Sequence, residues 1–142
     1  MARDDVEAAK WFRLAADQNN AAAQTYLGVF YDEGRGVDRD DAEAARLWRL
    51  AAAQGSAQAQ ANLGFLYDHG CGVELNPWEA LRLYRLSAAQ NYPEGLYNLG
   101  VAYEQGCVVP QDLNEAARFY RAAAAQHLTI AEKALRCLGY DS

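Results

Sequence analysis

The sequence predicts an all-α fold, an α-solenoid of antiparallel helix pairs, from two observations. First, the 142-residue chain aligns with itself at a spacing of 36 residues. Second, apolar residues within each period follow helical spacing and are interrupted by a glycine-rich loop. Self-similarity at a period of 20 to 50 residues is typical of stacked arrays rather than of one globular core. The most uniform columns of this alignment are Leu27/Leu63/Leu99, Gly28/Gly64/Gly100, Tyr31/Tyr67/Tyr103, Gly34/Gly70/Gly106 and Val37/Val73/Val109.

The chain divides into five segments in this alignment. We expect a half repeat at 2–20, full repeats at 21–56, 57–92 and 93–128, and a terminal partial repeat at 129–142. Each full repeat is expected to hold two helices, called A and B, joined by the glycine-rich loop. The first half repeat is then a helix B and the last segment a helix A, which gives about seven to eight helices in one repeat domain.

The second full repeat shows the pattern of both helices. Its loop contains Gly70, Cys71 and Gly72. Apolar residues recur at helical spacing before and after that loop: Ala59, Leu63, Leu66 and Tyr67, then Ala80, Leu83, Tyr84 and Ala88.

Each helix B is predicted to begin with a capping box. An Asx residue is followed three residues later by Glu in all four copies: Asp4/Glu7, Asp40/Glu43, Asn76/Glu79 and Asp112/Glu115. Pro77, at the first helical position, supports one of these starts.

A repeated glycine inside helix A needs a packing reason, because glycine costs a helix roughly 1 kcal/mol relative to alanine. We interpret Gly28, Gly64 and Gly100 as points of close approach to helix B, with the alanine columns of helix B opposite them.

These motifs resemble the Sel-one-like repeat, a relative of the tetratricopeptide repeat. The second repeat carries the resemblance with Leu63-Gly64-x-x-Tyr67-x-x-Gly70-x-Gly72-Val73, then Asn76-x-x-Glu79-Ala80, Leu83-Tyr84-Arg85 and Ala88-Ala89-Gln90. The resemblance implies a right-handed solenoid with helices A on the concave face and helices B on the convex face. It also implies an adaptor that binds proteins and seldom catalyses, as in bacterial signalling, envelope and host-interaction proteins. Two positions depart from the pattern: Val108 stands in a loop glycine column, and Arg136 in the helix A glycine column.

Composition excludes several other classes. The net charge of −6 argues against a nucleic-acid partner. No stretch approaches the ~20 apolar residues of a membrane span, and the N-terminus lacks the apolar core of a signal peptide. We therefore expect a cytoplasmic protein if the chain is complete; the sequence does not decide whether it is a domain of a longer one. Three cysteines, an odd number, argue against a disulfide framework, and we expect reduced thiols.

The charged residues are sorted between the two kinds of helix. Basic residues gather on helices B, the first of each pair three residues after a capping Glu: Lys10/Arg13, Arg46/Arg49, Arg82/Arg85 and Arg118/Arg121. Asp32, Asp68 and Glu104 form a column in the last turn of helix A, where the helix dipole disfavours anions. This column is either an acidic binding rim or a solvated edge.

The predicted partner-binding surface lies on helices A. One column of helix A, unlike the uniform packing columns, differs in residue type between repeats: Val29, Phe65 and Val101. The expected anchors on the open face are Phe65 and Tyr97. The predicted set on the concave face is Val29, Asp32, Asn62, Phe65, Asp68, Tyr97, Asn98, Val101 and Glu104.

The sequence thus predicts a protein-interaction scaffold that binds a protein or peptide, basic in character, and needs no cofactor. Two alternatives stay open. The terminal half repeats could stack on another copy, which makes a weak homo-oligomer. More remotely, a metal-binding or enzymatic protein could use mixed zinc ligands: Asp68, His69, Cys71, Glu104 and Cys107.

Overall fold

The computed structural model describes residues 2–140 and confirms the all-α prediction. Within these residues there are eight helices and no strand. The helices are α1 (Arg3–Asp17), α2 (Ala21–Glu33), α3 (Asp41–Ala53), α4 (Ala57–His69), α5 (Pro77–Ala89), α6 (Pro93–Gln105), α7 (Leu113–Ala124) and α8 (Thr129–Cys137).

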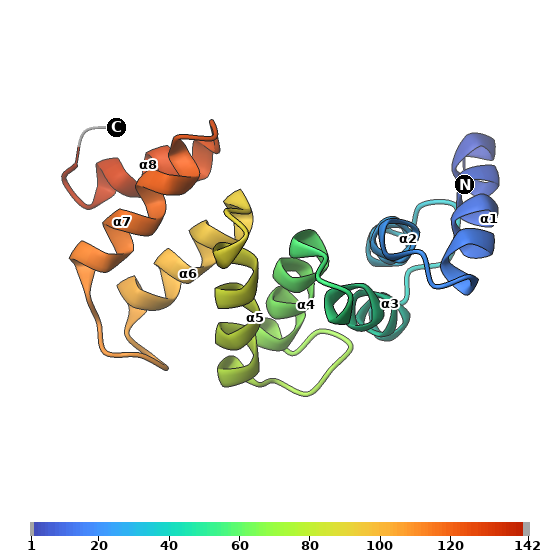
Figure 1. The fold of residues 1–142 in the computed structure, drawn as a ribbon, viewed down its shortest axis with the longest axis horizontal. Coiled ribbons are helices and arrows are strands. Elements are labelled where there is room, and N and C mark those ends of the chain that lie inside the picture. The colour runs from blue at the N-terminus through green and yellow to red at the C-terminus, as the bar shows by residue number, and fades with distance from the viewer. Residues whose placement is uncertain (1, 141–142) are drawn as a thin grey trace.

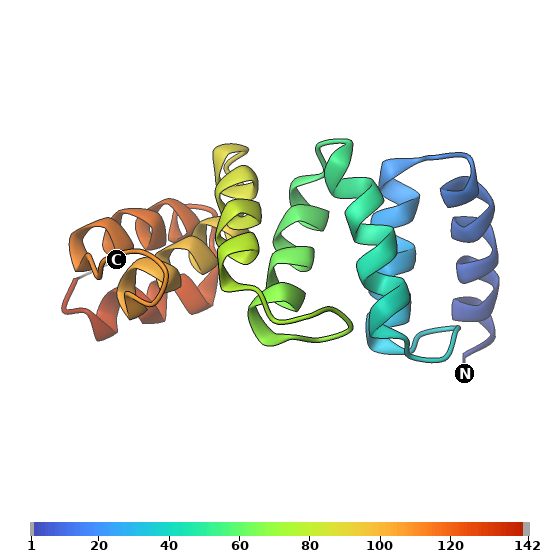
Figure 2. The same cartoon turned by 90° about the horizontal axis from the view of Figure 1, so that it is seen from below.

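Consecutive helices pack side by side in an extended solenoid (Figures 1 and 2). Helices α2, α4, α6 and α8 are helices A, and α1, α3, α5 and α7 are helices B. The array is an arc, because α1 and α8 rise on the same side of the central helices α4 and α5 (Figure 1).

The glycine column lies against helix B, as predicted, but the facing side chain is aromatic. A Cβ atom on Gly64 would stand 2.7 Å from Cε1 of Tyr84, and one on Gly100 would stand 2.6 Å from Cε1 of Tyr120. Gly28 meets the indole ring of Trp48 in the same way. The alanine columns contribute only backbone carbonyls at this contact, so their placement opposite the glycines is a wrong expectation. The glycines admit a ring between the helices of each pair.

Three of the four predicted N-caps are present. The side chains of Asp40, Asn76 and Asp112 each accept a hydrogen bond from the backbone N–H three residues later, at 3.0, 3.2 and 3.0 Å. The backbone N–H of each cap donates to the carbonyl of a helix A tyrosine, at 2.9, 2.9 and 3.0 Å. The glutamates are therefore free to pair with arginine instead of completing a capping box.

The predicted cap at Asp4 is wrong. Helix α1 begins at Arg3, its N-cap is Ala2, and no side chain caps it. In the described chain no helix A precedes α1, so the tyrosine carbonyl that fixes the other three caps is missing here. Asp4 instead lies in the first helical turn.

Neighbouring repeats are joined by polar side chains that recur with the period. Gln54 donates to the side chain of Asn19 at 3.2 Å, and Gln90 donates to the Gly55 carbonyl at 2.9 Å. Gln126 donates to the Asn91 carbonyl at 2.8 Å. These contacts fix the stacking of successive helix pairs.

The loops follow the glycine pattern except where Val108 replaces it. Gly36 and Gly72 have left-handed φ angles of +68° and +69° and press against the backbone at the start of the preceding helix B. Val108 has no such φ angle, and it packs against Tyr84 and its neighbours instead. His127, with φ +68°, occupies the column of Asn19, Gly55 and Asn91.

Candidate partner-binding surface

All nine predicted site residues lie on three consecutive helices A. Val29 and Asp32 come from α2, the central three from α4 and the remaining four from α6. The structure brings them into one band along the array, but it buries them unequally. Phe65 and Asp68 are exposed; the other seven are half-buried: Val29, Asp32, Asn62, Tyr97, Asn98, Val101 and Glu104.

Phe65 is the open aromatic of this band. Its side chain is 47% exposed, and its ring stacks on His69 with centroids 4.0 Å apart and planes 25° from parallel. Nδ1 of His69 also lies 3.0 Å from the Phe65 carbonyl oxygen, one helical turn away. The histidine therefore covers one face of the ring, while about half of the side chain stays exposed.

Tyr97 does not lie free of the helix contacts, contrary to the prediction. Its ring packs on Tyr120 of α7, with centroids 5.6 Å apart, and it contributes to the core around Leu135. Substitution of Tyr97 will therefore alter stability as well as the surface.

Tyr26, on α2, is an exposed aromatic that was not among the predicted residues. It stands in the column of Asn62 and Asn98 and is 48% exposed, with its ring 5.5 Å from that of Phe12. The signal was available, because this column changes from an aromatic residue to asparagine between repeats. Tyr26 extends the band of variable side chains toward the first helix.

The three acidic residues of the column have different environments. Glu104 accepts a hydrogen bond of 2.8 Å from the hydroxyl of Tyr120. Asp32 is half-buried, and burial together with the charge of Asp41 raises the pKa of its carboxyl. Asp68 is exposed, and its carboxylate lies near the Tyr84 hydroxyl without a hydrogen bond to it in the described chain. The column is therefore not a uniform acidic rim.

A pocket of about 180 Å³ opens beside Asp68, between α5 and α6. The side chains of Tyr84, Asn98, Val101 and Ala102 line it. Tyr84 is 3% exposed, and its hydroxyl has no hydrogen-bond partner among the described residues. Burial, and then the nearby carboxylate of Asp68, raise the pKa of this hydroxyl.

The basic residues of helices B are paired, as predicted. Arg46 contacts Glu43 at 2.5 Å and Arg82 contacts Glu79 at 2.7 Å; the corresponding pairs are Lys10–Glu7, at 3.9 Å, and Arg118–Glu115. The second arginine of each helix contacts a tyrosine of the next helix A or of the C-terminal end: Arg13–Tyr31, Arg49–Tyr67 and Arg85–Tyr103 by hydrogen bonds, and Arg121 over the ring of Tyr140.

The residues of the zinc alternative do not converge. No group of three or more His, Cys, Asp or Glu side chains in residues 2–140 is placed to hold a metal ion. Cys71 packs against the apolar core, and Glu104 accepts a hydrogen bond from Tyr120. The three cysteines, Cys71, Cys107 and Cys137, are all free thiols in the structure.

Across the described part of the chain, no helix combines the length and apolar character that crossing a membrane requires.

The stacked helix pairs, the glycine–aromatic contacts and the recurrent caps define a helical-repeat protein, an α-solenoid. Comparison with known proteins refines this class. The Sel1 repeat model matches four consecutive segments, residues 1–20, 21–56, 57–92 and 93–128, and the chain therefore belongs to the Sel1 repeat family. Proteins built from these repeats are generally protein-interaction scaffolds and are typically non-catalytic.

Two solved structures share the fold over nearly the whole chain. A Sel1 repeat protein from Oxalobacter formigenes is 33% identical, with a TM-score of 0.83 over 92% of this chain and 53% of its own. The protein c5321, a protective antigen of uropathogenic Escherichia coli with an SLR fold, is 36% identical, with a TM-score of 0.81 over 93% of this chain and 29% of its own. This chain thus spans about half of the first protein and less than a third of the second. No curated protein matches the chain.

Proposed function

We propose that this protein is an interaction scaffold that binds a protein or peptide segment along its helices A, on the concave face of the solenoid. The observation that carries the proposal is the exposed Phe65 at the centre of a band whose other residues vary between repeats. Packing columns keep the same residue type because each repeat makes the same helix contacts, whereas residues that contact one partner can differ between repeats. The proposed contact residues are Val29, Asp32, Asn62, Phe65, Asp68, Tyr97, Asn98, Val101 and Glu104.

The chemistry of the band suits a segment with apolar and basic residues. Phe65 offers an aromatic anchor, and aromatic residues dominate binding hot spots. Asn62 and Asn98 offer amides to a peptide backbone, and the free carboxylate of Asp68 attracts cations. On helices B the charges are already paired with one another, so that face offers fewer free groups to a partner.

Site-specific photo-crosslinking tests this proposal. A benzoylphenylalanine in place of Asn62 reports on the helix A surface, and one in place of Leu86, which is 42% exposed on helix B, is the matched control. In extracts of the source cells, we expect the Asn62 probe to capture a defined partner and the Leu86 probe to miss it. Capture from Leu86 alone would place binding on the other face.

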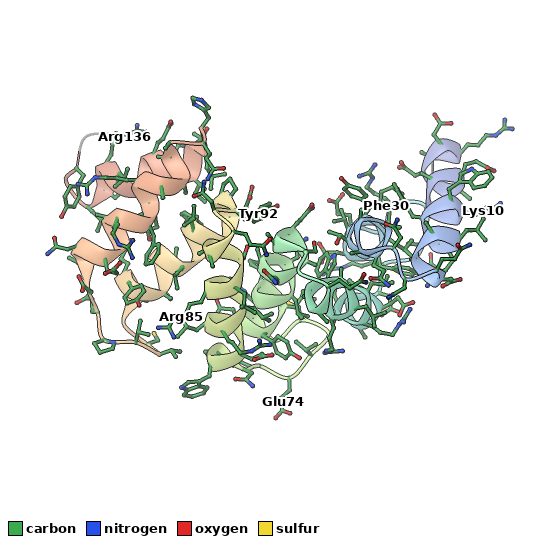
Figure 3. All side chains as sticks on the ribbon, in the orientation of Figure 1. Lys10, Phe30, Glu74, Arg85, Tyr92 and Arg136 are labelled. Atoms are coloured by element: carbon green, nitrogen blue, oxygen red, sulfur yellow. The ribbon has the colours of Figure 1, made fainter. Side chains whose placement is uncertain are left out.

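Self-association is the second candidate, and the N-terminal helix favours it. Trp11 is 68% exposed, whereas Leu47 and Leu83 of the same column are buried against the preceding helix pair. Helix α1 thus presents an apolar face that in α3 and α5 is covered. Lys10 lies on this end of the array, and Arg136, on α8, lies at the other (Figure 3).

Arg136 opposes the simplest form of stacking. It stands in the glycine column, where helix B of the same repeat approaches so closely that a Cβ atom would stand less than 3 Å from its aromatic side chain. Light scattering over a range of concentrations tests self-association. A mass that rises with concentration and falls to that of one chain in Trp11→Asp supports it, and a constant mass of one chain excludes it.

A further inference from the structure

The pocket between α5 and α6 exists because the second and third full repeats depart from the repeat pattern in side-chain size. Val101 and Ala102 of α6 line the pocket. The residues 36 positions earlier are Phe65 and Leu66, and Leu66 is buried in the core. The smaller Ala102 therefore leaves space here that Leu66 fills one repeat earlier.

The loop after α6 adds to the same space. Gly36 and Gly72 let the two earlier loops press against the start of the preceding helix B. Val108 occupies this column in the third loop and carries a side chain, so the backbone cannot approach the start of α5 in that way. Val108 accordingly forms part of the pocket lining.

The hydrogen bonding of the polar groups at this pocket also differs from that at the equivalent positions of the other repeats. In the third repeat, Glu104 reaches the hydroxyl of Tyr120 at 2.8 Å. In the second repeat, the equivalent acid is Asp68, shorter by one methylene, and the equivalent hydroxyl, that of Tyr84, has no hydrogen-bond partner in the described chain. In the first repeat the ring is Trp48, whose Nε1 donates to the Thr25 carbonyl at 2.9 Å.

The second repeat therefore combines a free carboxylate, a buried hydroxyl without a partner and an apolar-walled space. A buried polar group without a hydrogen bond costs roughly 1–3 kcal/mol, so a ligand that supplies the missing partner is favoured. The volume of about 180 Å³ is comparable to that of the ~150 Å³ cavity that accepts benzene. It has room for one side chain.

We propose that this pocket is a subsite for one arginine side chain of the bound segment. The alkyl stem would lie along Val101 and Ala102, as the stems of long basic residues do on apolar surfaces. The guanidinium would pair with Asp68 and supply a hydrogen-bonding partner at Tyr84, with the amide of Asn98 as a further acceptor. Arginine fits better than lysine, because its planar group donates to several acceptors at once and pairs with carboxylates bidentately. The inference rests on the proposed binding along helices A and names the partner chemistry of one position there.

A titration with a single amino-acid derivative tests the subsite without the natural partner. N-acetyl-arginine methylamide is added to ¹⁵N-labelled protein, and the amide resonances of the pocket are followed by NMR. N-acetyl-citrulline methylamide is the neutral isostere, and N-acetyl-lysine methylamide is the second cation. We expect the arginine derivative to bind in the millimolar range, typical of so small a ligand. The citrulline derivative should bind about tenfold more weakly, because it lacks the charge-assisted hydrogen bonds.

Three variants test whether the arginine derivative binds in this pocket, and each changes one side chain by a small amount. Ala102→Leu fills the space with the residue found at Leu66, Asp68→Glu introduces the acid that reaches tyrosine in the next repeat, and Asp68→Asn removes the charge at constant size. The arginine-induced shifts should disappear in the first variant and weaken in the other two, while the spectra show a folded protein.

Several results would overturn the subsite. The proposal fails if the wild-type pocket shows no shifts, or if the arginine and citrulline derivatives bind equally. It also fails if the lysine derivative binds more tightly than the arginine derivative, or if Ala102→Leu binds the arginine derivative as the wild type does. These outcomes leave crosslinking from Asn62 untouched, so a failed subsite is distinguishable from a failed scaffold function. Conversely, if the arginine derivative binds but the Asn62 probe captures no partner, the pocket is an isolated site. That result would refute its place in a longer binding surface.

Discussion

Replacement of Gly64 tests the glycine–aromatic packing on which the helix pairs depend. A Cβ atom at this position would stand 2.7 Å from Cε1 and 2.9 Å from Cδ1 of Tyr84, closer than real Cβ atoms approach. Alanine gains about 1 kcal/mol in helix propensity but overpacks the contact, which costs about 1–3 kcal/mol. Gly64→Ala should therefore lose between zero and about 2 kcal/mol of unfolding free energy.

Gly64→Leu adds three further carbons where no space exists, so the helices of the pair must separate. We expect a loss of about 3 kcal/mol or more, equivalent to a fall in Tm of about 10 °C for a chain of this size. Urea denaturation followed by circular dichroism measures the loss. Ala53→Leu, at an exposed position of α3, is the matched small-to-large control and should change little. An unchanged midpoint in Gly64→Leu would refute the packing described for this column.

Three further changes have distinct expected outcomes. Asp40→Ala removes a side-chain cap and should cost about 1 kcal/mol, whereas Asp4→Ala, which removes none, should cost far less; equal losses in urea denaturation would contradict the cap assignment. Tyr97→Ala should lower stability by about 1–2 kcal/mol through lost packing on the next helix B, and a Tm like that of the wild type would mean the ring is not part of the core. Hydrogen bonding from Arg82 lowers the pKa of Glu79, so this pair stabilises the fold above the unfolded glutamate pKa and loses its effect as pH falls through the folded value. The stability difference between wild type and Glu79→Gln should be a few tenths of a kcal/mol at neutral pH and vanish near pH 3; a difference that persists at low pH would contradict it.

The helix pairs could be predicted from the sequence because their determinants repeat. The Leu, Gly and Tyr columns, the Asx caps and the loop glycines recur at one spacing, and each recurrence reports the same local packing problem. Asp4 shows the limit of this reasoning, because it has the spacing of a cap but, within residues 2–140, no preceding helix A to fix its backbone N–H. The facing ring at Gly28 and Gly64 was also missed, since its column changes from Trp48 to Tyr84.

The candidate site was less predictable, because it depends on differences between repeats. Tyr97 looks open in the sequence, yet Tyr120 of the following helix B covers it. The pocket depends on Ala102 being smaller than Leu66 and on Asp68 being shorter than Glu104. Such differences are visible in the alignment of the repeats, but their effect on space and hydrogen bonding appears only once the helices are placed together.

The most direct test of binding along helices A compares affinity with stability for Phe65→Ala. The crosslinked partner, once identified, is titrated against wild type, Phe65→Ala and Leu86→Ala, and the Tm of each protein is measured. Because Phe65 is half exposed, its truncation should cost about 1 kcal/mol of stability or less. As a hot-spot aromatic it should cost about 2 kcal/mol of binding, roughly a thirtyfold loss of affinity, while Leu86→Ala binds like the wild type. Wild-type affinity in Phe65→Ala, or a fall in its Tm as large as that of Gly64→Leu, would contradict the account.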